Sequence, residues 1–523
     1  MAVNHGTVWT PIELELSGDV HVDNPYETVE LETTFEHESG ESIRVPGFWD
    51  GDDTWKVRFA PVKSGIWEWS TTADPSVDEL SDSGTLDVGE YAGANPIRKN
   101  GFLRVGENDR SIVHDDGTPF FWLGDTAWPA AAKATPEEWR RYLAKRSSQG
   151  FNVVQTNALP QWDASRPRGR YPFGREWDLS SPNPEYFQTV DELVEMTYRA
   201  GIVPALVALW FDYVPGERDA RPNTFTVDGA ARFGRYLAAR YGAYGTVWLV
   251  SGDSALPEET LEYYDAAARA LHESVTHPLC TLHMVSSTTT SEAAVEKDWF
   301  DFHCYQSGHH IGERQRNAYR FAVDSRAMEP TRPVLNGEPC YEDHGYFEEP
   351  DLRISRETVR RAAWWSVLSG ANAGITYGAH GIWHWHRQGE HVSHAEDRAM
   401  PRPWTEALEF PGADDYAFLA EFLSSFSFET LEPRQEAAPD ADETVRVAEL
   451  PEDGRLLAYT PDARSVAVDA SALTVDVEEF TWVDPATGRE VEAESEIETE
   501  ADVGESITVE PPFWNGDALL VGR

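Results

Sequence analysis

Two acidic residues each end a short apolar run of the kind that forms a buried parallel strand. Asp253 ends the run 246–253 (TVWLVSGD), and Glu338 ends the run 332–338 (RPVLNGE). Both runs are rich in Val, Leu or Trp and are bounded by turn residues. In a barrel, a carboxylate at the C-terminal end of a strand faces the mouth where catalysis takes place. Two such carboxylates facing each other are the minimum set for breaking a glycosidic bond.

The two carboxyl groups need different roles in that reaction. One protonates the leaving oxygen, while the other attacks the anomeric carbon or activates a water; a separation of about 5–5.5 Å gives retention and about 6.5–9.5 Å gives inversion. We expect Asp253 to be the general acid/base and Glu338 the nucleophile, at the shorter separation. The alternative for Asp253 is a helix cap, because Gly-Asp-Ser ahead of a proline is also capping chemistry.

Polar and aromatic residues near other predicted strand ends suit a carbohydrate cleft, because carboxylates and amides accept or donate hydroxyl hydrogen bonds and indoles stack on sugar C–H faces. Tyr305, at the end of predicted strand six, could donate to the nucleophile and keep its pKa low. Asp125 could equally cap a helix, and His303 could equally be a core histidine. The predicted substrate-binding residues are Asp125, Trp128, Asn157, Trp162, Trp210, His303, Tyr305 and Trp383.

Histidines offer a metal-dependent alternative. His384 and His386, or His309 and His310, stand close in sequence, but neither pair has an acidic third ligand in a recognisable motif. We therefore predict no metal site and no cofactor. Walker, GxGxxG, HExxH and GxSxG motifs are absent from the sequence, which counts against the common NTPase, dinucleotide-binding, zincin and serine-hydrolase classes.

The composition indicates a folded and strongly acidic protein. Its 523 residues carry 91 acidic and 43 basic side chains, a net charge of -48, and only six of the basic residues are lysine. A 41% hydrophobic and 12% aromatic content supports large packed cores. Acidity with little lysine resembles proteins of salt-loving organisms, where screening over about 3 Å at 1 M salt limits self-repulsion. Nucleic acid is not expected as a partner, because no basic face fits this charge balance.

The N-terminus and the cysteines point to a reducing compartment. Residues 1–6 show neither a basic nor an apolar signal region, and no apolar stretch approaches the roughly 20 residues of a membrane span. Cys280, Cys304 and Cys340 have no CxxC spacing and are expected to be reduced and buried. We expect a cytoplasmic protein without membrane contact, although removal of a signal peptide would leave the same N-terminus.

The pattern of apolar residues divides the chain into three predicted domains. Short alternating segments separated by turn residues predict a β-sandwich over residues 5–96. Residues 97–428 alternate between strands and amphipathic helices, and the eight repeats predict a (β/α)8 TIM barrel. Alternation returns over 440–523, which predicts a second β-sandwich. The expected fold is therefore a central TIM barrel with a β-sandwich on either side. The helices are predicted at 135–149, 185–200, 229–241, 257–275, 291–297, 313–324, 354–369 and 413–425.

Several segments resemble a known family. Residues 120–128 (FFWLGDTAW), 145–155 (KRSSQGFNVVQ) and the two carboxylate strands resemble the apiosidase-like barrels, the DUF4038 group that includes glycoside hydrolase family 140. Residues 55–61 (WKVRFAP) and 65–69 (GIWEW) are similar to the DUF5060 β-sandwich that precedes such barrels. The C-terminal region resembles the β-domain that follows them, of the kind named a collagen-binding domain.

The resemblance implies a retaining, exo-type glycosidase with an Asp on strand four and a Glu on strand seven, which are Asp253 and Glu338 here. It implies a terminal glycosyl residue of a plant-type oligo- or polysaccharide as the substrate. Two other functions stay open from the residues themselves: a non-catalytic carbohydrate-binding protein on a barrel scaffold, and a metal-dependent hydrolase that uses the histidines after strand eight.

Overall fold

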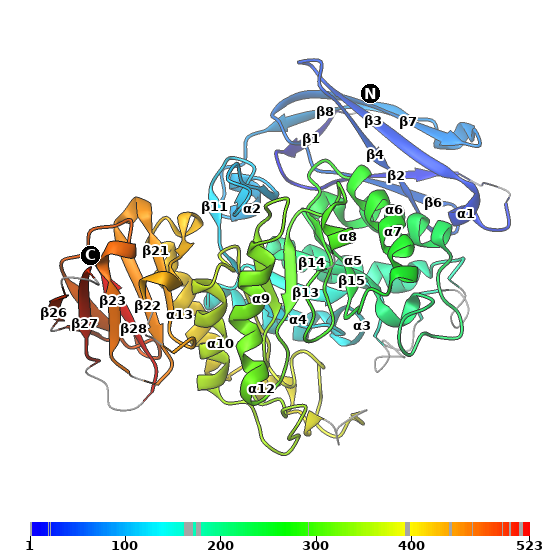
Figure 1. Cartoon of the computed structure of the whole chain (residues 1–523). Helices are drawn as coiled ribbons and strands as arrows, with labels where there is room; N and C mark the ends of the chain where they lie inside the picture. The colour runs from blue at the N-terminus through cyan, green and yellow to red at the C-terminus, as the bar shows by residue number, and fades with distance from the viewer. Residues whose placement is uncertain are drawn as a thin grey trace.

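The computed structural model describes residues 3–18, 20, 22–161, 171–173, 179–290, 292–392, 398–438, 442–462, 464–493, 495–500, 504–511 and 516–523. A central barrel separates the N-terminal strands from the C-terminal strands, which lie on different sides of it (Figure 1). The expected fold class, a TIM barrel between two β-sandwiches, is confirmed.

The N-terminal region consists of two packed sheets. The alternating segments place every second side chain on the inner face, as in β2 and β3, where buried and exposed positions alternate. Phe35 and Phe59 stack between the sheets at a ring distance of 3.9 Å. The larger sheet has the order β1 (Val3–Thr7), β8 (Ser83–Gly89), β7 (Gly65–Asp74), β3 (Glu30–His37) and β4 (Ser42–Pro46), and the smaller one the order β2 (Ile12–Ser17), β6 (Thr54–Phe59) and β5 (Phe48–Gly51). The short helix α1 (Pro25–Thr28) precedes β3.

The barrel strands are all parallel. In spatial order they are β16 (Cys280–Thr281), β15 (Val247–Gly252), β14 (Val203–Trp210), β13 (Val153–Asn157), β12 (Trp122–Thr126), β19 (Gly374–Tyr377), β18 (Val334–Glu338) and β17 (His303–Gln306). A parallel bridge between His283 and Cys304 joins the two ends of this sheet and closes the ring. Helix α2 (Pro96–Asn100) and a small antiparallel sheet of β9 (Leu103–Val105), β10 (Ile112–His114) and β11 (Pro119–Phe120) precede the first barrel strand.

The predicted helices form close to their expected bounds. Thr135 caps α4 with a complete capping box, because its hydroxyl accepts from the backbone N–H of Glu138 and the Glu138 carboxylate accepts from the backbone N–H of Thr135. The helices of the barrel are α3 (Ala130–Lys133), α4 (Pro136–Ser148), α5 (Pro184–Arg199), α6 (Val227–Tyr241), α7 (Leu261–Glu273), α8 (Glu292–Val295), α9 (Asn317–Arg326), α10 (Arg356–Leu368), α12 (Trp404–Ala407) and α13 (Gly412–Ser424).

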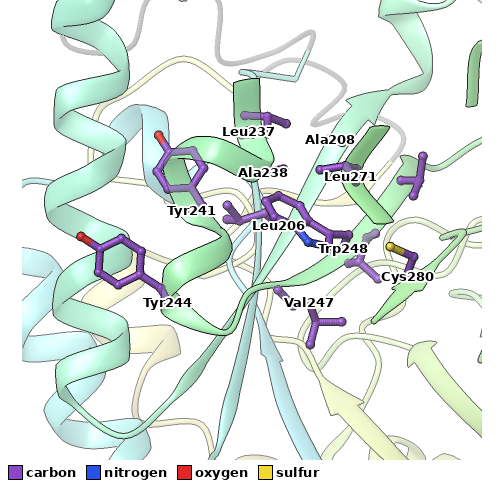
Figure 2. Close-up of a cluster of buried hydrophobic side chains, with 14 of the residues drawn as sticks. Leu206, Ala208, Leu237, Ala238, Tyr241, Tyr244, Val247, Trp248, Leu271 and Cys280 are labelled. Atoms are coloured by element: carbon purple, nitrogen blue, oxygen red, sulfur yellow. The ribbon is translucent and has the colours of Figure 1, made fainter. Parts of the chain in front are cut away.

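Apolar side chains fill the layer between the barrel strands and the surrounding helices. Trp248 on β15 is fully buried, and so are Leu237 on α6 and Leu271 on α7. Figure 2 shows this layer, with Leu206, Ala208 and Trp248 from the strands and Leu237, Ala238, Tyr241 and Leu271 from the helices. Burial of these side chains provides the main favourable free energy of this packing and holds the strand ends in place.

The C-terminal region is a second two-sheet structure. The first sheet has the order β20 (Glu432–Pro433), β21 (Arg446–Leu450), β22 (Arg455–Thr460), β28 (Ala518–Gly522), β24 (Phe480–Val483) and β25 (Glu490–Glu492). The second sheet has the order β23 (Val466–Asp469), β27 (Gly504–Val509) and β26 (Ser495–Glu500). Trp482 from the first sheet and Val466 and Val509 from the second share one buried apolar cluster.

Buried arginines connect the barrel to both β-regions. Arg58 on β6 donates to Asp191 on α5 at 2.7 Å, and Arg240 on α6 donates to Asp50 on β5 at 2.6 Å. On the other side, Arg360 on α10 donates to both carboxylate oxygens of Asp517 at 2.8 and 2.6 Å. Among the described residues, no helix is both long and apolar enough to span a membrane.

Candidate active site

A glycine precedes each of the two acidic residues, and each glycine lies against a neighbouring strand. A Cβ at Gly252 would lie 2.2 Å from the ring of Trp210, and a Cβ at Gly337 would lie 2.2 Å from Sγ of Cys304. Both distances are well inside van der Waals contact, so only glycine fits at these positions. The strand ends therefore approach their neighbours closely, just before Asp253 and Glu338.

Asp253 follows β15 with a left-handed backbone, at φ 55°. Its carboxylate accepts from Arg218 at 2.6 Å, and its side chain is 24% exposed. The next residue, Ser254, donates through its hydroxyl to the buried carboxyl of Glu217, which also accepts from Tyr264 at 3.1 Å. Non-glycine residues occupy this backbone region rarely, and such strain concentrates at functional sites where surrounding contacts maintain it.

Glu338 ends β18 and is held by three side chains. Nε2 of His283 lies 3.2 Å from one of its oxygens, and Nε2 of His309 lies 3.2 Å from the other. The Tyr341 hydroxyl accepts from the Trp128 indole at 3.1 Å and hydrogen-bonds Glu338. The Glu338 side chain is only 7% exposed.

The backbone fixes the tautomer of both histidines. The backbone N–H of Asp253 donates to Nδ1 of His283 at 3.3 Å, and that of Tyr341 donates to Nδ1 of His309 at 3.1 Å. Because Nδ1 accepts in each ring, the neutral ring carries its proton on Nε2. The Nε2–H group of His309 therefore donates to Glu338, and the Nε2–H group of His283 lies beside the other Glu338 oxygen.

These surroundings move the two carboxyl pKa values in opposite directions. Burial alone would raise the pKa of Glu338, but the hydrogen bonds from His283 and His309 outweigh it and hold that pKa well below its usual range. Burial raises the pKa of Asp253; the Arg218 guanidinium opposes this rise and the Glu338 charge adds to it. Two carboxyl groups with separated pKa values are the usual arrangement of an acid and a nucleophile.

Both acidic side chains line one cavity of ≈ 230 Å³ at the C-terminal ends of the barrel strands. Three tryptophans and two arginines also form its wall, together with other polar and aromatic side chains. The lining residues are Trp128, Gln161, Trp210, Arg218, Asp253, Val285, Ser286, Gln306, His309, Glu338, Tyr341, His344, Phe347, Trp383 and Arg398.

Three of the predicted substrate-binding residues, Trp128, Trp210 and Trp383, line this cavity. Asn157 does not line the cavity itself, but its side-chain amide donates to the lining residue Gln161 at 3.2 Å. Trp162 lies outside the described residues.

Asp125, His303 and Tyr305 do not reach the cavity. Asp125 is fully buried and accepts from Arg146 at 2.6 Å and from Tyr142 at 2.8 Å. β17 begins, instead of ending, at His303, so this residue lies at the far end of the barrel, where burial lowers its pKa to about 4. Tyr305 points out of the barrel wall and donates to the backbone carbonyl of Ala318 on α9 at 2.7 Å.

His283 and Arg218 were not among the predicted site residues, and His309 and Tyr341 were predicted no role in holding the nucleophile. Tyr341 is three residues beyond Glu338 and takes the role expected of Tyr305. His283 lies two residues beyond β16, and a polar residue at a strand end was a signal that the sequence offered. Arg218 comes from a loop whose path no sequence pattern indicates.

The histidines considered for a metal are not grouped as a metal ion would need. Across the described parts of the chain, no three His, Cys, Asp or Glu side chains come together in such a cluster. His309 instead faces Glu338, and the His384 ring packs edge-on against Trp383 at 5.0 Å.

Two family descriptions match parts of the chain. Residues 106–430 match the family described as apiosidase-like, catalytic domain, and residues 6–74 match a domain of unknown function, DUF5060. No curated protein sequence matches the chain.

Solved structures share the architecture. One described as a glycoside hydrolase is 25% identical with a TM-score of 0.72, covering 82% of this chain and 98% of its own. A glycoside hydrolase family 5 protein from Bacteroides vulgatus is 26% identical with a TM-score of 0.71, covering 82% of this chain and 94% of its own. A putative glycoside hydrolase from the same species shares the fold over 99% of both chains, with 18% identity and a TM-score of 0.74. Because the apiosidase-like match spans the whole barrel and both acidic strand ends, this chain belongs to the apiosidase-like family and is a glycosidase.

Proposed function

We propose that this glycosidase acts with retention, with Asp253 as general acid/base and Glu338 as nucleophile. The observation that carries the proposal is that both acids line one cavity, Asp253 beside Arg218 and Glu338 beside two histidines, His283 and His309. These neighbours accompany opposed pKa shifts, downward for Glu338 and upward for Asp253. A nucleophile must be charged and a general acid must be protonated in the same pH range, which this pair provides.

The first step uses both groups together. Asp253 gives its proton to the glycosidic oxygen while one Glu338 oxygen attacks the anomeric carbon, so that a glycosyl-enzyme forms and the aglycone leaves as an alcohol. In the second step the Asp253 carboxylate takes a proton from water, the hydroxide oxygen bonds to the anomeric carbon, and Glu338 leaves as a carboxylate. Three side chains hold Glu338 between them, which suits a nucleophile that has to keep one position.

The cavity supports a terminal sugar as the substrate. Its ≈ 230 Å³ lies below the about 300–1,000 Å³ of pockets for drug-sized ligands, so it suits one sugar ring better than a length of polysaccharide. Trp128, Trp210 and Trp383 offer indole faces and edges to sugar C–H groups. With the family membership, this supports exo-action on a plant-type oligo- or polysaccharide, with apiosides as the first substrates to test.

The test is a screen of aryl glycosides (apiosides, arabinofuranosides, rhamnosides and galactosides) in buffers from low to molar salt. For a substrate that is cleaved, proton NMR of the first product gives its anomeric configuration, and we expect retention. Inversion would overturn the nucleophilic role of Glu338.

Two variants assign the roles. Glu338→Gln is expected to abolish cleavage of every substrate. Asp253→Asn is expected to slow substrates with poor leaving groups by about 10²–10⁴-fold and activated aryl glycosides less, because an activated leaving group needs little protonation. Unchanged activity in Glu338→Gln would contradict the proposal. A screen without any cleaved substrate, repeated with extracted plant polysaccharides and again negative, would count against catalysis by this pair.

A further inference from the structure

A second cluster on the cavity rim has the arrangement of a serine-hydrolase triad. Nε2 of His310 lies 3.0 Å from the Ser286 hydroxyl and 2.8 Å from the Ser287 hydroxyl. On the other side of the ring, Nδ1 of His310 lies 2.8 Å from the Glu348 carboxylate. None of these four residues has a part in the glycosidase steps above.

The carboxylate settles the direction of these hydrogen bonds. An ionised Glu348 accepts only, so Nδ1 of His310 carries the proton and donates, and Nε2 keeps a lone pair for a serine hydroxyl. The other Glu348 oxygen accepts from the backbone N–H of Ile311 at 3.2 Å, and Arg314 lies 3.5 Å from the carboxylate. Hydroxyl, histidine base and orienting carboxylate are thus in the order that activates a serine.

Burial keeps His310 available as a base. It lowers the pKa of His310, against the opposing effect of Glu348, and so favours the neutral ring. Backbone geometry also holds the serines in place: Ser287 is left-handed at φ 67°, and Gly308 lies so close that an added Cβ would be 2.0 Å from the Ser286 hydroxyl. Ser286, unlike Ser287, lines the cavity.

We propose that Ser286, His310 and Glu348 form a second catalytic site, a serine esterase that removes ester-linked acyl groups from the carbohydrate in the cavity. Ser286 is the proposed nucleophile because Ser286, and not Ser287, lines the cavity. A glycosidase that meets acylated sugars gains from this position, because an acyl group blocks the close fit of a sugar ring in a cavity of ≈ 230 Å³.

The reaction balances with water as the only co-reactant. The Ser286 oxygen attacks the acyl carbon as its proton moves to Nε2 of His310, and the sugar oxygen leaves with that proton, which gives an acyl-serine and a free sugar hydroxyl. Water then loses a proton to the same nitrogen, its oxygen attacks the acyl carbon, and Ser286 regains its proton as the carboxylic acid leaves. Glu348 stays ionised and steadies the imidazolium.

The test is covalent labelling of the full-length protein with a fluorophosphonate, followed by peptide mass spectrometry. The chain offers an internal control: the Ser39 hydroxyl lies 2.8 Å from Nδ1 of His37, but Nε2 of that ring contacts the backbone carbonyl of Ser64 at 3.0 Å and no carboxylate orients it. We expect label on Ser286 and none on Ser39. Absence of label on Ser286, or label on Ser287 or Ser39 at an equal rate, overturns the proposal.

Ester hydrolysis provides the second measurement, with p-nitrophenyl acetate and an acetylated aryl glycoside as probes. Ser286→Ala is expected to remove the label and the turnover, and Glu348→Gln to slow both by at least about 10²-fold. Glu348 is partly exposed, at 36%, so the conservative Gln variant is expected to fold, and its melting temperature checks this. Labelling at the wild-type rate in Glu348→Gln contradicts the triad. These readouts need neither Asp253 nor Glu338, so they are independent of the glycosidase mechanism.

Discussion

The backbone N–H of Asp253 donates a hydrogen bond to Nδ1 of His283, at 3.3 Å. Nε2 of the same ring faces Glu338 at 3.2 Å. The backbone of the proposed acid/base therefore fixes which nitrogen of His283 is protonated, and that proton holds the proposed nucleophile ionised. The left-handed backbone at Asp253 belongs to the same arrangement, because it sets the direction of this N–H and of the side chain together. Asp253 thus serves as the proposed acid/base through its side chain and orients His283 beside the proposed nucleophile through its backbone.

His283 and His309 are expected to set the acidic limit of activity. Each places its Nε2 3.2 Å from one Glu338 oxygen, so His283→Gln or His309→Gln weakens the stabilisation of the carboxylate and raises its pKa. Glu338 must be ionised to attack, and activity is lost as pH falls through its pKa. The acidic limb of the kcat/KM profile is therefore expected to move to higher pH in both variants.

A pH profile of kcat/KM checks this, with His272→Gln on α7 as a control histidine outside the cavity. A loss of activity that is equal at every pH would show that the histidines only maintain the shape of the site. A shift in one variant alone would show that the Glu338 oxygens are not equivalently held.

Arg218 is expected to set the alkaline limit. Its guanidinium, 2.6 Å from Asp253, opposes the rise in pKa that burial causes. Replacement by Met keeps an apolar contact with Phe211, over which the guanidinium stacks at 4.1 Å, but removes the charge. The pKa of Asp253 then rises further, the group stays protonated to higher pH, and the alkaline limb of the profile moves upward. Arg269→Met, at an exposed ion pair, is the matched control. A downward or absent shift would mean that Arg218 does not act on Asp253.

The sequence carried enough information for the barrel and for its two acids. Apolar runs that end in Gly-Asp and Gly-Glu have one reasonable place in a parallel barrel, so Asp253 and Glu338 were placed from strand order alone. Helix bounds were also predictable, because the capping box at Thr135 and the amphipathic periods are local signals.

The side chains around the acids depend on information that local patterns lack. Tyr305 was expected to contact Glu338 because predicted strand six was thought to end there, but β17 extends to Gln306, and Gln306 lines the cavity. Neighbouring side chains of a strand point to opposite faces, so Tyr305 faces α9 instead. His309 and Arg218 lie on loops, and tertiary contacts determine the conformation of a loop.

Asp125 allows a direct test of a structural against a binding role. It was expected to bind sugar, but it is fully buried beside Arg146. Asp125→Asn breaks a buried ion pair, so the free energy of unfolding is expected to fall by about 3–5 kcal/mol, with KM of the folded enzyme unchanged. Urea denaturation measures the first quantity and steady-state kinetics the second. Glu195→Gln, which removes the exposed pair with Arg199, is the control and should cost under about 1 kcal/mol. A raised KM at unchanged stability would restore the binding role.

Substitutions at Gly337 and Cys304 are expected to have coupled effects on stability, because the Cys304 sulfur occupies the space that a side chain at position 337 would need. An added Cβ at position 337 would lie 2.2 Å from Sγ of Cys304 but 3.8 Å from its Cβ. Gly337→Ala alone is therefore expected to lower the free energy of unfolding by about 1–3 kcal/mol and to reduce kcat, since it displaces the backbone next to Glu338. Cys304→Ala removes the sulfur, so the double variant leaves only an ordinary van der Waals contact. It is expected to recover most of the stability and activity that Gly337→Ala loses. Denaturation and kcat of the four proteins form a double-mutant cycle, and simple additivity of the two losses would contradict this packing.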